Sequence, residues 1–500
     1  MLGFFVNSTT DLYRKIRAMN QGNFSKYIEL AFHTVIHSLN WIAGMLAGLL
    51  LLPIYSKELS VAEYGALDLS QQLSGLVRSV FASAFTYSIA KFYHSAVSVK
   101  EKGEAIWTNA ISLSTLGICL CGMFVLFNDS LTMTLYGRKE YASFAFLTTL
   151  SLAVDFCNMG FSSQFLVEKK SLIFVCLAVL RLLIAIALNL FFLLSLKLGG
   201  NGMLLGGLIS SGIVTAVSIV ICFNKFSFRF NPKLARDMFR AGYPMIPATC
   251  LALFLHQGDR FFLSHYKGLD SLGFFTMAVQ FPSQLNALLL TSFNQVWINN
   301  YLHDSQVRTS SENYIAKSAA FFMAFYLGCQ ALLCVFIPLV FASLVDDKFQ
   351  ESLSQVPVVS LAFCVHAVYI FLTTSGFQTG KFLPLTLSYL VACCTKIGIY
   401  LFFRDSGVFL PSVSMLVSYA VFVTCCYVFY RRSNNNQVDL RIHLLQFLIF
   451  FAVVFGIGPQ GSAELSLSNA IYLLCWSLVI PALMVLPLGL FLKMRPLRHG

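Results

Sequence analysis

Long apolar blocks alternate with short polar segments along this chain. A helix that crosses a bilayer needs about 20 mostly apolar residues, and the sequence holds fourteen blocks of roughly that length. The pattern therefore predicts an all-α polytopic membrane protein with about 14 transmembrane helices. The predicted spans are residues 30–54, 66–90, 106–127, 143–165, 172–195, 202–223, 244–265, 271–297, 316–343, 354–376, 382–403, 407–430, 443–459 and 468–492.

Composition and loop charge support this pattern. The chain is 57% hydrophobic and 11% charged, whereas soluble domains average about 25% charged residues. If the N-terminus is cytoplasmic, 23 Lys and Arg fall in cytoplasmic segments and 7 in outer loops, as the positive-inside rule requires. We therefore interpret the net charge of +12 as a topology signal and expect no nucleic-acid partner. Both termini are predicted to be cytoplasmic.

The segments between the blocks suggest a domain organisation. A mixed polar and basic tail comes first, and a basic, alternately apolar stretch in the middle predicts an amphipathic helix on the inner surface. We expect two six-helix lobes and an additional C-terminal helix pair. The predicted boundaries are 1–27 for the tail, 28–223 for the N-lobe, 224–242 for the linker, 243–430 for the C-lobe and 431–500 for the last pair.

A weak internal repeat relates the two predicted lobes. A shift of 208 residues places the start of the second span on the start of the eighth span, with a glycine at the same place in each. An even number of spans separates the copies, so both lobes have the same orientation. Parallel repeats of this kind are typical of transporters with a site between two lobes. The matching pairs are Gly65 with Gly273, Gln72 with Gln280, Phe85 with Phe293 and Tyr93 with Tyr301.

Six charges inside the predicted spans indicate a polar interior. A charge at the bilayer centre costs at least about 2.5 kcal/mol, so these side chains should face protein or water. Four are cations and two are carboxylates, and a surplus of cations favours an anionic passenger. The cavity candidates for substrate binding are Arg78, Arg181, Arg260 and Lys396. The candidates for coupling-ion binding or gating are Asp155, Asp259, His256 and His366.

Structural roles compete with this interpretation. Arg78 and Arg181 could instead pair with Asp155, because buried charges usually pair. Asp259 and Arg260 are adjacent, point about 100° apart on a helix, and should serve different neighbours, one at the lobe interface and one at the outer polar edge. Lys396 either lines the cavity or extends outward to the interface.

Other polar residues predict no further chemistry. Uncharged donors and acceptors accompany the charges at Gln71, Gln72, Gln284, Asn286 and Asn294. His33 and His37 share a helix face, but a metal site needs a third ligand, so we expect a hydrogen-bonded pair. We predict no metal site, no cofactor and no catalytic residue.

Two stretches resemble a known family. One is LLLPIYSKELSVAEYGALDLSQQLSGLVRSVFASAFTYSIAKFYH (50–94), with Pro53, Glu63-Tyr64-Gly65 and Lys91-Phe92-Tyr93. The other is AGYPMIPATCLALFLHQGDRFFLSHYKGLDSLGFFTMA (241–278), with Gly242, Pro244, Pro247, Asp259-Arg260-Phe261, Leu263 and Gly273. Both resemble Wzx-type O-antigen and lipopolysaccharide flippases of the multidrug/oligosaccharidyl-lipid/polysaccharide (MOP) superfamily, which includes MATE transporters. Many members have twelve spans, so fourteen is a departure.

The resemblance implies a function. It predicts a bacterial inner-membrane flippase, not an enzyme, that moves undecaprenyl-diphosphate-linked oligosaccharide by alternating access in O-antigen or related polysaccharide biosynthesis. Membrane lipids, a coupling H⁺ or Na⁺ and the polysaccharide polymerase machinery are the other candidate partners. A multidrug or cation antiporter of the same superfamily and a membrane-embedded polymerase, ligase or acyltransferase are alternatives. The antiporter would need acidic residues deep in the N-lobe, and the enzyme would need an acid beside His366.

Overall fold

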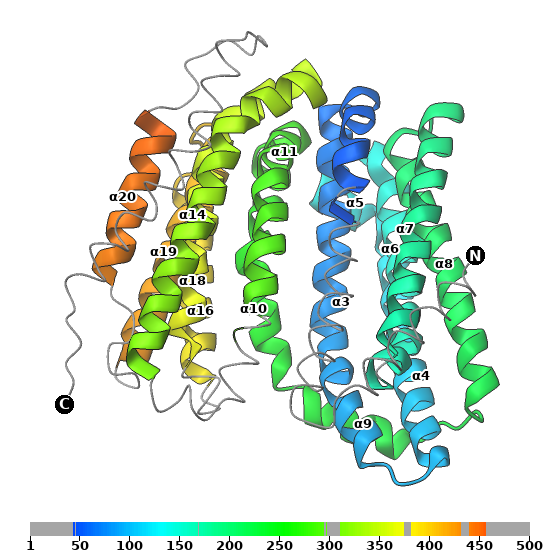
Figure 1. Cartoon of the computed structure of the whole chain (residues 1–500). Helices are drawn as coiled ribbons and strands as arrows, with labels where there is room; N and C mark the ends of the chain where they lie inside the picture. The colour runs from blue at the N-terminus through cyan, green and yellow to red at the C-terminus, as the bar shows by residue number, and fades with distance from the viewer. Residues whose placement is uncertain are drawn as a thin grey trace, which may run out of the picture.

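The computed structural model is all-helical in the residues that it describes (Figure 1). These are residues 44–45, 47–168, 170–294, 297, 311–374, 382–431 and 440–456. Within them, eight helices are long and apolar enough to cross a membrane, or nine if one bent pair counts as a single span. The predicted last span at 468–492 and most of the first, at 30–54, lie outside the described residues.

One group of helices forms what we call the N-lobe. Helix α3 lies next to the other group, α6 lies at the centre of this one and contacts α4 and α8, and α7 lies against α8. The bounds are α3 Val61–Ser95, α4 Val99–Leu126, α5 Asn128–Tyr136, α6 Ala142–Val167, α7 Ser171–Leu190 with a π-helical turn η2 Phe191–Ser195, and α8 Gly199–Lys225.

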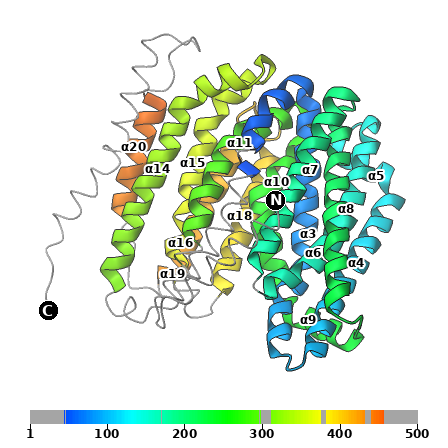
Figure 2. The same ribbon diagram turned by 45° about the vertical axis from the view of Figure 1, so that its right-hand side comes forward.

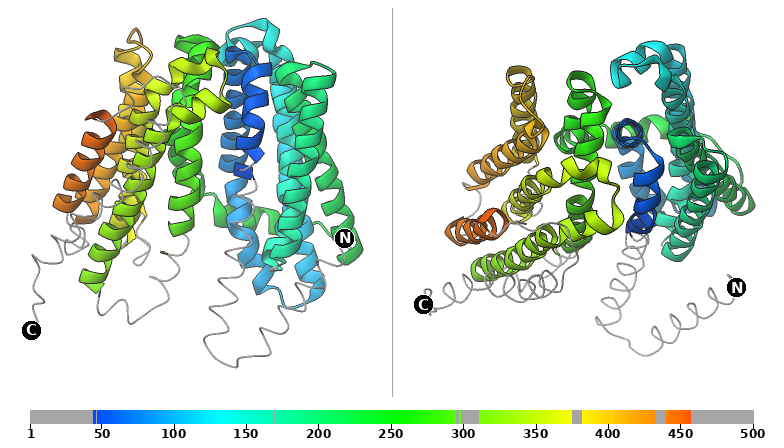
Figure 3. Two further views of the ribbon diagram at one scale, coloured as in Figure 1. Left: turned by 45° about the horizontal axis from the view of Figure 1, so that its top comes forward. Right: turned by 90° about the horizontal axis from the view of Figure 1, so that it is seen from above.

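Helices α10 to α19 form what we call the C-lobe, which lies beside the N-lobe when viewed from above (Figure 3). Helix α20 lies along α14 at the edge farthest from α3 (Figures 1 and 2). The bounds are α10 Met245–Tyr266, α11 Gly268–Asn286 with a π-helical turn η3 Ala287–Thr291, α14 Ser311–Leu344, η4 Asp347–Gln355, α15 Val356–Ala367, α16 Tyr369–Leu372, α18 Leu383–Phe402, α19 Leu410–Arg431 and α20 Leu440–Gly456.

The helices differ from the predicted spans in three places. Helix α3 begins at Val61, before the predicted start of the span at residue 66, because Ser60 and Glu63 form a reciprocal capping box. A short additional helix, α5, occupies the loop after α4. The predicted span at 354–376 begins earlier, at Asp347, and runs to Leu372 as the 3-10 helix η4 followed by α15 and α16, which together make one candidate span.

The linker contains a helix, as its alternating pattern predicts. Helix α9, Pro232–Gly242, is capped by Asn231, whose side chain accepts hydrogen bonds from the backbone of Lys233 and Leu234. Asn231 also donates to Glu104 on α4 at 2.6 Å. Helix α9 packs against α3 and α4 and meets α10 at 55°, so it connects the two lobes at the end of the molecule opposite α5 (Figure 1).

The two lobes touch through the backbones of α3 and α11. A Cβ atom on Gly65 would lie 2.4 Å from the carbonyl oxygen of Leu269 and 2.7 Å from the backbone nitrogen of Gly273. A Cβ atom on Gly273 would lie 2.1 Å from the carbonyl oxygen of Val61. Both contacts are with backbone, which cannot rotate away, so the approach requires glycine on each helix.

This contact predicts opposite results for two alanine substitutions on α3. Gly65→Ala should destabilise the structure, because the added methyl group meets backbone atoms. Gly75→Ala should be neutral or mildly stabilising, since a Cβ there has no neighbour within 4 Å and alanine is favoured over glycine in helices by about 1 kcal/mol. Thermal unfolding of the two purified variants in detergent measures the difference. Equal melting temperatures would show that the lobes do not depend on this contact.

Candidate functional site

Asp68 links the two lobes through side-chain hydrogen bonds, next to the glycine contact. It lies one turn after Gly65 on α3, and its side chain accepts hydrogen bonds from three groups. Arg260 Nε on α10 donates at 2.5 Å, Thr276 Oγ1 on α11 at 2.9 Å, and Gln72 Nε2 on α3 itself at 2.9 Å. Arg260 therefore lies at the lobe interface and is paired with a carboxylate.

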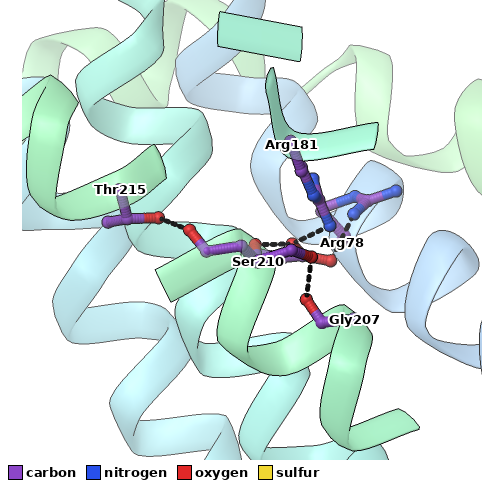
Figure 4. A network of polar contacts seen from close by, with 7 residues as sticks. Arg78, Arg181, Gly207, Ser210 and Thr215 are labelled. Atoms are coloured by element: carbon purple, nitrogen blue, oxygen red, sulfur yellow. Dashed lines mark hydrogen bonds and ion pairs between the residues drawn. The ribbon is translucent and has the colours of Figure 1, made fainter. Parts of the chain in front are cut away.

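A second cluster lies inside the N-lobe. Asp155 on α6 accepts hydrogen bonds from Arg78 of α3 at 2.6 Å and from Arg181 of α7 at 3.0 Å. Ser211 of α8 donates to the same carboxylate at 2.7 Å, and Thr215 donates to the Ser211 carbonyl. Figure 4 shows both arginines reaching one network, with the hydroxyl groups of α8 beside it. The Arg78–Asp155–Arg181 ion pairs considered from the sequence are thus present.

The charges in this cluster do not cancel. Two arginines share one carboxylate, which leaves a net charge of +1. The side chains of Arg78 and Arg181 are 34% and 37% exposed, whereas that of Asp155 is 11% exposed. The acid is therefore covered, whereas both arginine side chains are partly exposed.

A third cluster lies inside the C-lobe. Lys396 of α18 forms an ion pair with Asp259 of α10, and the Tyr400 hydroxyl donates to the other carboxylate oxygen at 3.0 Å. The side chains of Lys396 and Asp259 are 0% and 1% exposed. The expectation that one of Asp259 and Arg260 lies at the outer polar edge is wrong, because Asp259 has a buried partner. Lys396 does not extend outward either, since the same pair holds it in the interior.

A polar cavity of about 420 Å³ lies next to Arg260. Its wall comes mainly from C-lobe helices, with Gln72 of α3 from the N-lobe. His256 and His366 both line it, and His256 Nδ1 lies 2.5 Å from the Tyr419 hydroxyl. The two imidazole rings meet edge to face, with 4.7 Å between their centroids.

The structure does not bring the four cationic candidates together. Among the described lining residues of the cavity, Arg260 is the one that belongs to that set. Arg78 and Arg181 form the N-lobe cluster, and Lys396 is buried against Asp259. His33 and His37 lie outside the described residues.

Sequence reasoning overlooked Asp68. It lies within the predicted span 66–90 and belongs with the interior charges, which become four cations and three carboxylates when it is included. The repeat also signals it, because the 208-residue shift places Asp68 on Thr276, the residue that donates to it. Neutralisation of Arg260 therefore depends on a residue of the other lobe.

Comparison with known proteins identifies the family. A family model described as "Polysaccharide biosynthesis protein" matches residues 31–298, which is more than half of the chain. The chain belongs to this polysaccharide biosynthesis protein family. The search of curated proteins found no match.

Solved structures place this polysaccharide biosynthesis protein in a fold shared by MOP-superfamily transporters. A lipid II flippase MurJ in an inward closed conformation matches with a TM-score of 0.73 at 15% identity, over 92% of this chain and 99% of that one. An inward-facing multidrug resistance MATE family transporter of the MOP superfamily matches with a TM-score of 0.58 at 15% identity, over 81% of this chain and 94% of that one. A MOP superfamily transporter from Pyrococcus furiosus matches with a TM-score of 0.55 at 15% identity, over 81% and 96%. The protein is thus a multi-pass membrane protein with a MurJ- and MATE-like fold.

The buried pair in the C-lobe predicts a non-additive mutant cycle. Asp259→Asn and Lys396→Met should each lower the free energy of unfolding by roughly 3–5 kcal/mol, because each leaves a buried charge without its partner. The double variant should recover most of that loss, since asparagine still accepts the Tyr400 hydrogen bond and no charge remains. Unfolding of the single and double variants in detergent gives the coupling free energy. Additive losses would contradict a pairing role.

Proposed function

We propose that the protein is a flippase that carries an undecaprenyl-diphosphate-linked oligosaccharide across the bacterial inner membrane by alternating access between the two lobes. The oligosaccharide serves O-antigen or related surface polysaccharide biosynthesis. Family membership supports a polysaccharide role, and the likeness to a lipid II flippase supports a lipid-linked substrate.

The observation that carries the proposal is the surplus cation of the N-lobe cluster. Arg78 and Arg181 share Asp155, so the cluster offers one uncompensated positive charge. Two guanidinium groups held on one carboxylate keep N–H donors available, and arginine binds phosphate oxygens through paired hydrogen bonds. A diphosphate placed there would gain charge-assisted hydrogen bonds that the hydrocarbon core cannot provide.

The same charges argue against a cation antiporter. A binding site for an organic cation needs a carboxylate that no resident cation neutralises. Asp68, Asp155 and Asp259 each pair with an arginine or lysine in the part of the chain that the structure describes. The interior charge therefore favours an anionic cargo over a cationic one.

Coupling to an H⁺ or Na⁺ gradient is part of the proposal, and Asp155 and Asp259 are its carboxylate candidates. Each carboxylate already accepts hydrogen bonds from a cation and a hydroxyl group. Binding of a coupling ion at either place therefore requires the resident cation to move away, which would link ion binding to helix movement. His256 and His366 are the candidates that form no ion pair with any of the described residues. The polymerase machinery is the proposed partner after transport.

Charge-matched variants of the N-lobe cluster test the function. Arg78→Gln leaves one arginine for one carboxylate, so the fold should persist while the surplus charge disappears. Hydrogen bonds to charged groups contribute about 1.5–3 kcal/mol, so transport should fall at least about tenfold. The double variant Arg78→Gln/Asp155→Asn restores the net charge of +1 and should recover part of the activity. The transport activity of both variants is measured as the amounts of surface polysaccharide and of lipid-linked intermediates in deletion cells complemented with each variant.

Arg404→Gln is the control, because Arg404 lies in an outer connection with its side chain 63% exposed. The deletion strain itself should lose surface polysaccharide and accumulate lipid-linked saccharide. Intact polymer with unchanged intermediates in that strain would refute the flippase function. Full activity of Arg78→Gln would refute the role of the surplus charge.

A further inference from the structure

We infer that the C-lobe cavity is the binding subsite for the saccharide part of the cargo, separate from the diphosphate site at Arg78 and Arg181. This inference rests on the proposed function and deepens it. It assigns His366 a direct contact with sugar hydroxyl groups, together with Gln257. The two sites then divide one amphipathic ligand between a cationic cluster and a neutral cavity.

His366 is the first observation. The residue is 4% exposed and lines the cavity, yet neither ring nitrogen has a hydrogen-bond partner among the described residues. Its ring is held by aromatic neighbours, with centroids 4.6 Å from Tyr419 and 4.5 Å from Tyr369. A buried polar group without a partner costs free energy, and a ligand hydroxyl group in the cavity would supply the missing hydrogen bond.

The chemistry of the wall is the second observation. Gln257 Oε1 is also buried without a partner among the described residues, and Asn286, Asn294 and Ser283 add amide and hydroxyl groups to the lining. These groups both donate and accept hydrogen bonds, as sugar hydroxyl groups do. An apolar drug or a lipid tail would leave them unsatisfied at a cost. The wall therefore fits a hydroxyl-rich ligand.

Charge is the third observation. Arg260 is the charged group among the described lining residues, and Asp68 neutralises it. The cavity therefore lacks the positive surplus of the N-lobe cluster, which makes it a poor site for a diphosphate. Its volume of about 420 Å³ falls within the range of roughly 300–1,000 Å³ of small-molecule sites, so it has room for a saccharide.

The position of the cavity is the fourth observation. Gln72 of α3 lines it, and Gln72 lies less than two turns, or roughly 9 Å, from Arg78 along the same helix. The two side chains leave the helix about 120° apart, so a lipid-linked molecule that occupies both sites would bridge two faces of α3. The Asp68–Arg260 ion pair lies between the glycine contact and this cavity on α3.

Equilibrium binding to two lipids tests the inference. The probes are undecaprenyl diphosphate and the lipid-linked saccharide that accumulates in cells lacking this gene. The full-length protein in detergent micelles is titrated with each and analysed by native mass spectrometry. Wild-type protein should bind the saccharide-bearing lipid about tenfold more tightly. His366→Phe should remove most of that difference without changing the affinity for undecaprenyl diphosphate, and His366→Gln should keep part of it.

Two further variants complete the design. Gln257→Met preserves side-chain length and should also reduce the preference for saccharide, which provides a second test if His366→Phe folds poorly. His265→Phe is the matched control, because this exposed histidine of α10 does not line the cavity, and it should change nothing. A full saccharide preference in folded His366→Phe and Gln257→Met, or an equal loss for both lipids, would overturn the subsite.

The outcomes separate this inference from the proposed function. If the wild-type protein binds both lipids equally and Arg78→Gln weakens both, the flippase function stands and the saccharide subsite is refuted. If the deletion strain accumulates no lipid-linked saccharide, the function is refuted and the subsite with it.

Discussion

The arrangement of the two lobes depends on one close contact between backbones. Gly65 of α3 and Gly273 of α11 leave no room for a side chain, so the two helices meet at van der Waals distance. This contact sets the relative position of the residues that follow on each helix. One turn further along each helix, Asp68 and Thr276 form a hydrogen bond. These pairs are the positions that the 208-residue repeat matches, so equivalent residues of the two lobes face each other across the interface. A substitution at this contact therefore acts on both lobes together.

Neutralisation of buried charge is the second constraint, and it is met differently in the two lobes. The C-lobe pairs Lys396 with Asp259 one for one, and the interface pairs Arg260 with Asp68. The N-lobe alone leaves a surplus, with two arginines on Asp155. The surplus is tolerated because the two arginine side chains are about one third exposed, whereas the fully buried Lys396 needs a complete partner. Exposure and charge imbalance thus coincide at Arg78 and Arg181, as the proposed diphosphate site requires.

Much of the fold could be predicted from the sequence, and less of the site. Apolar blocks and loop charge identify the helices, because the length of a block and the charge of a loop can be read from a short stretch of sequence. Positions 354–376 show the limit: a span is present there, but it starts at Asp347, within the charged segment DKFQESLSQ that forms η4 and that hydropathy alone excludes. The partners of Arg260 and Lys396 come from distant segments, and only the three-dimensional packing joins them. Asp68 could have been identified as an interior charge, since the repeat places it on Thr276. Its ion pair with Arg260 could not, because a single carboxylate in an apolar span does not indicate its partner.

The division between a cationic N-lobe cluster and a neutral C-lobe cavity has a consequence for the proposed alternating-access transport. A ligand that contacts both sites binds best when the lobes are in one particular arrangement, so its binding energy favours that arrangement over the other. Asp68 and Gln72 connect the two sites through α3, because one lies in the interface ion pair and the other in the cavity wall. A rotation of α3 about the glycine contact would therefore change the interface ion pair and the cavity together. In this view, the lipid-linked saccharide is itself part of what determines how the two lobes are arranged.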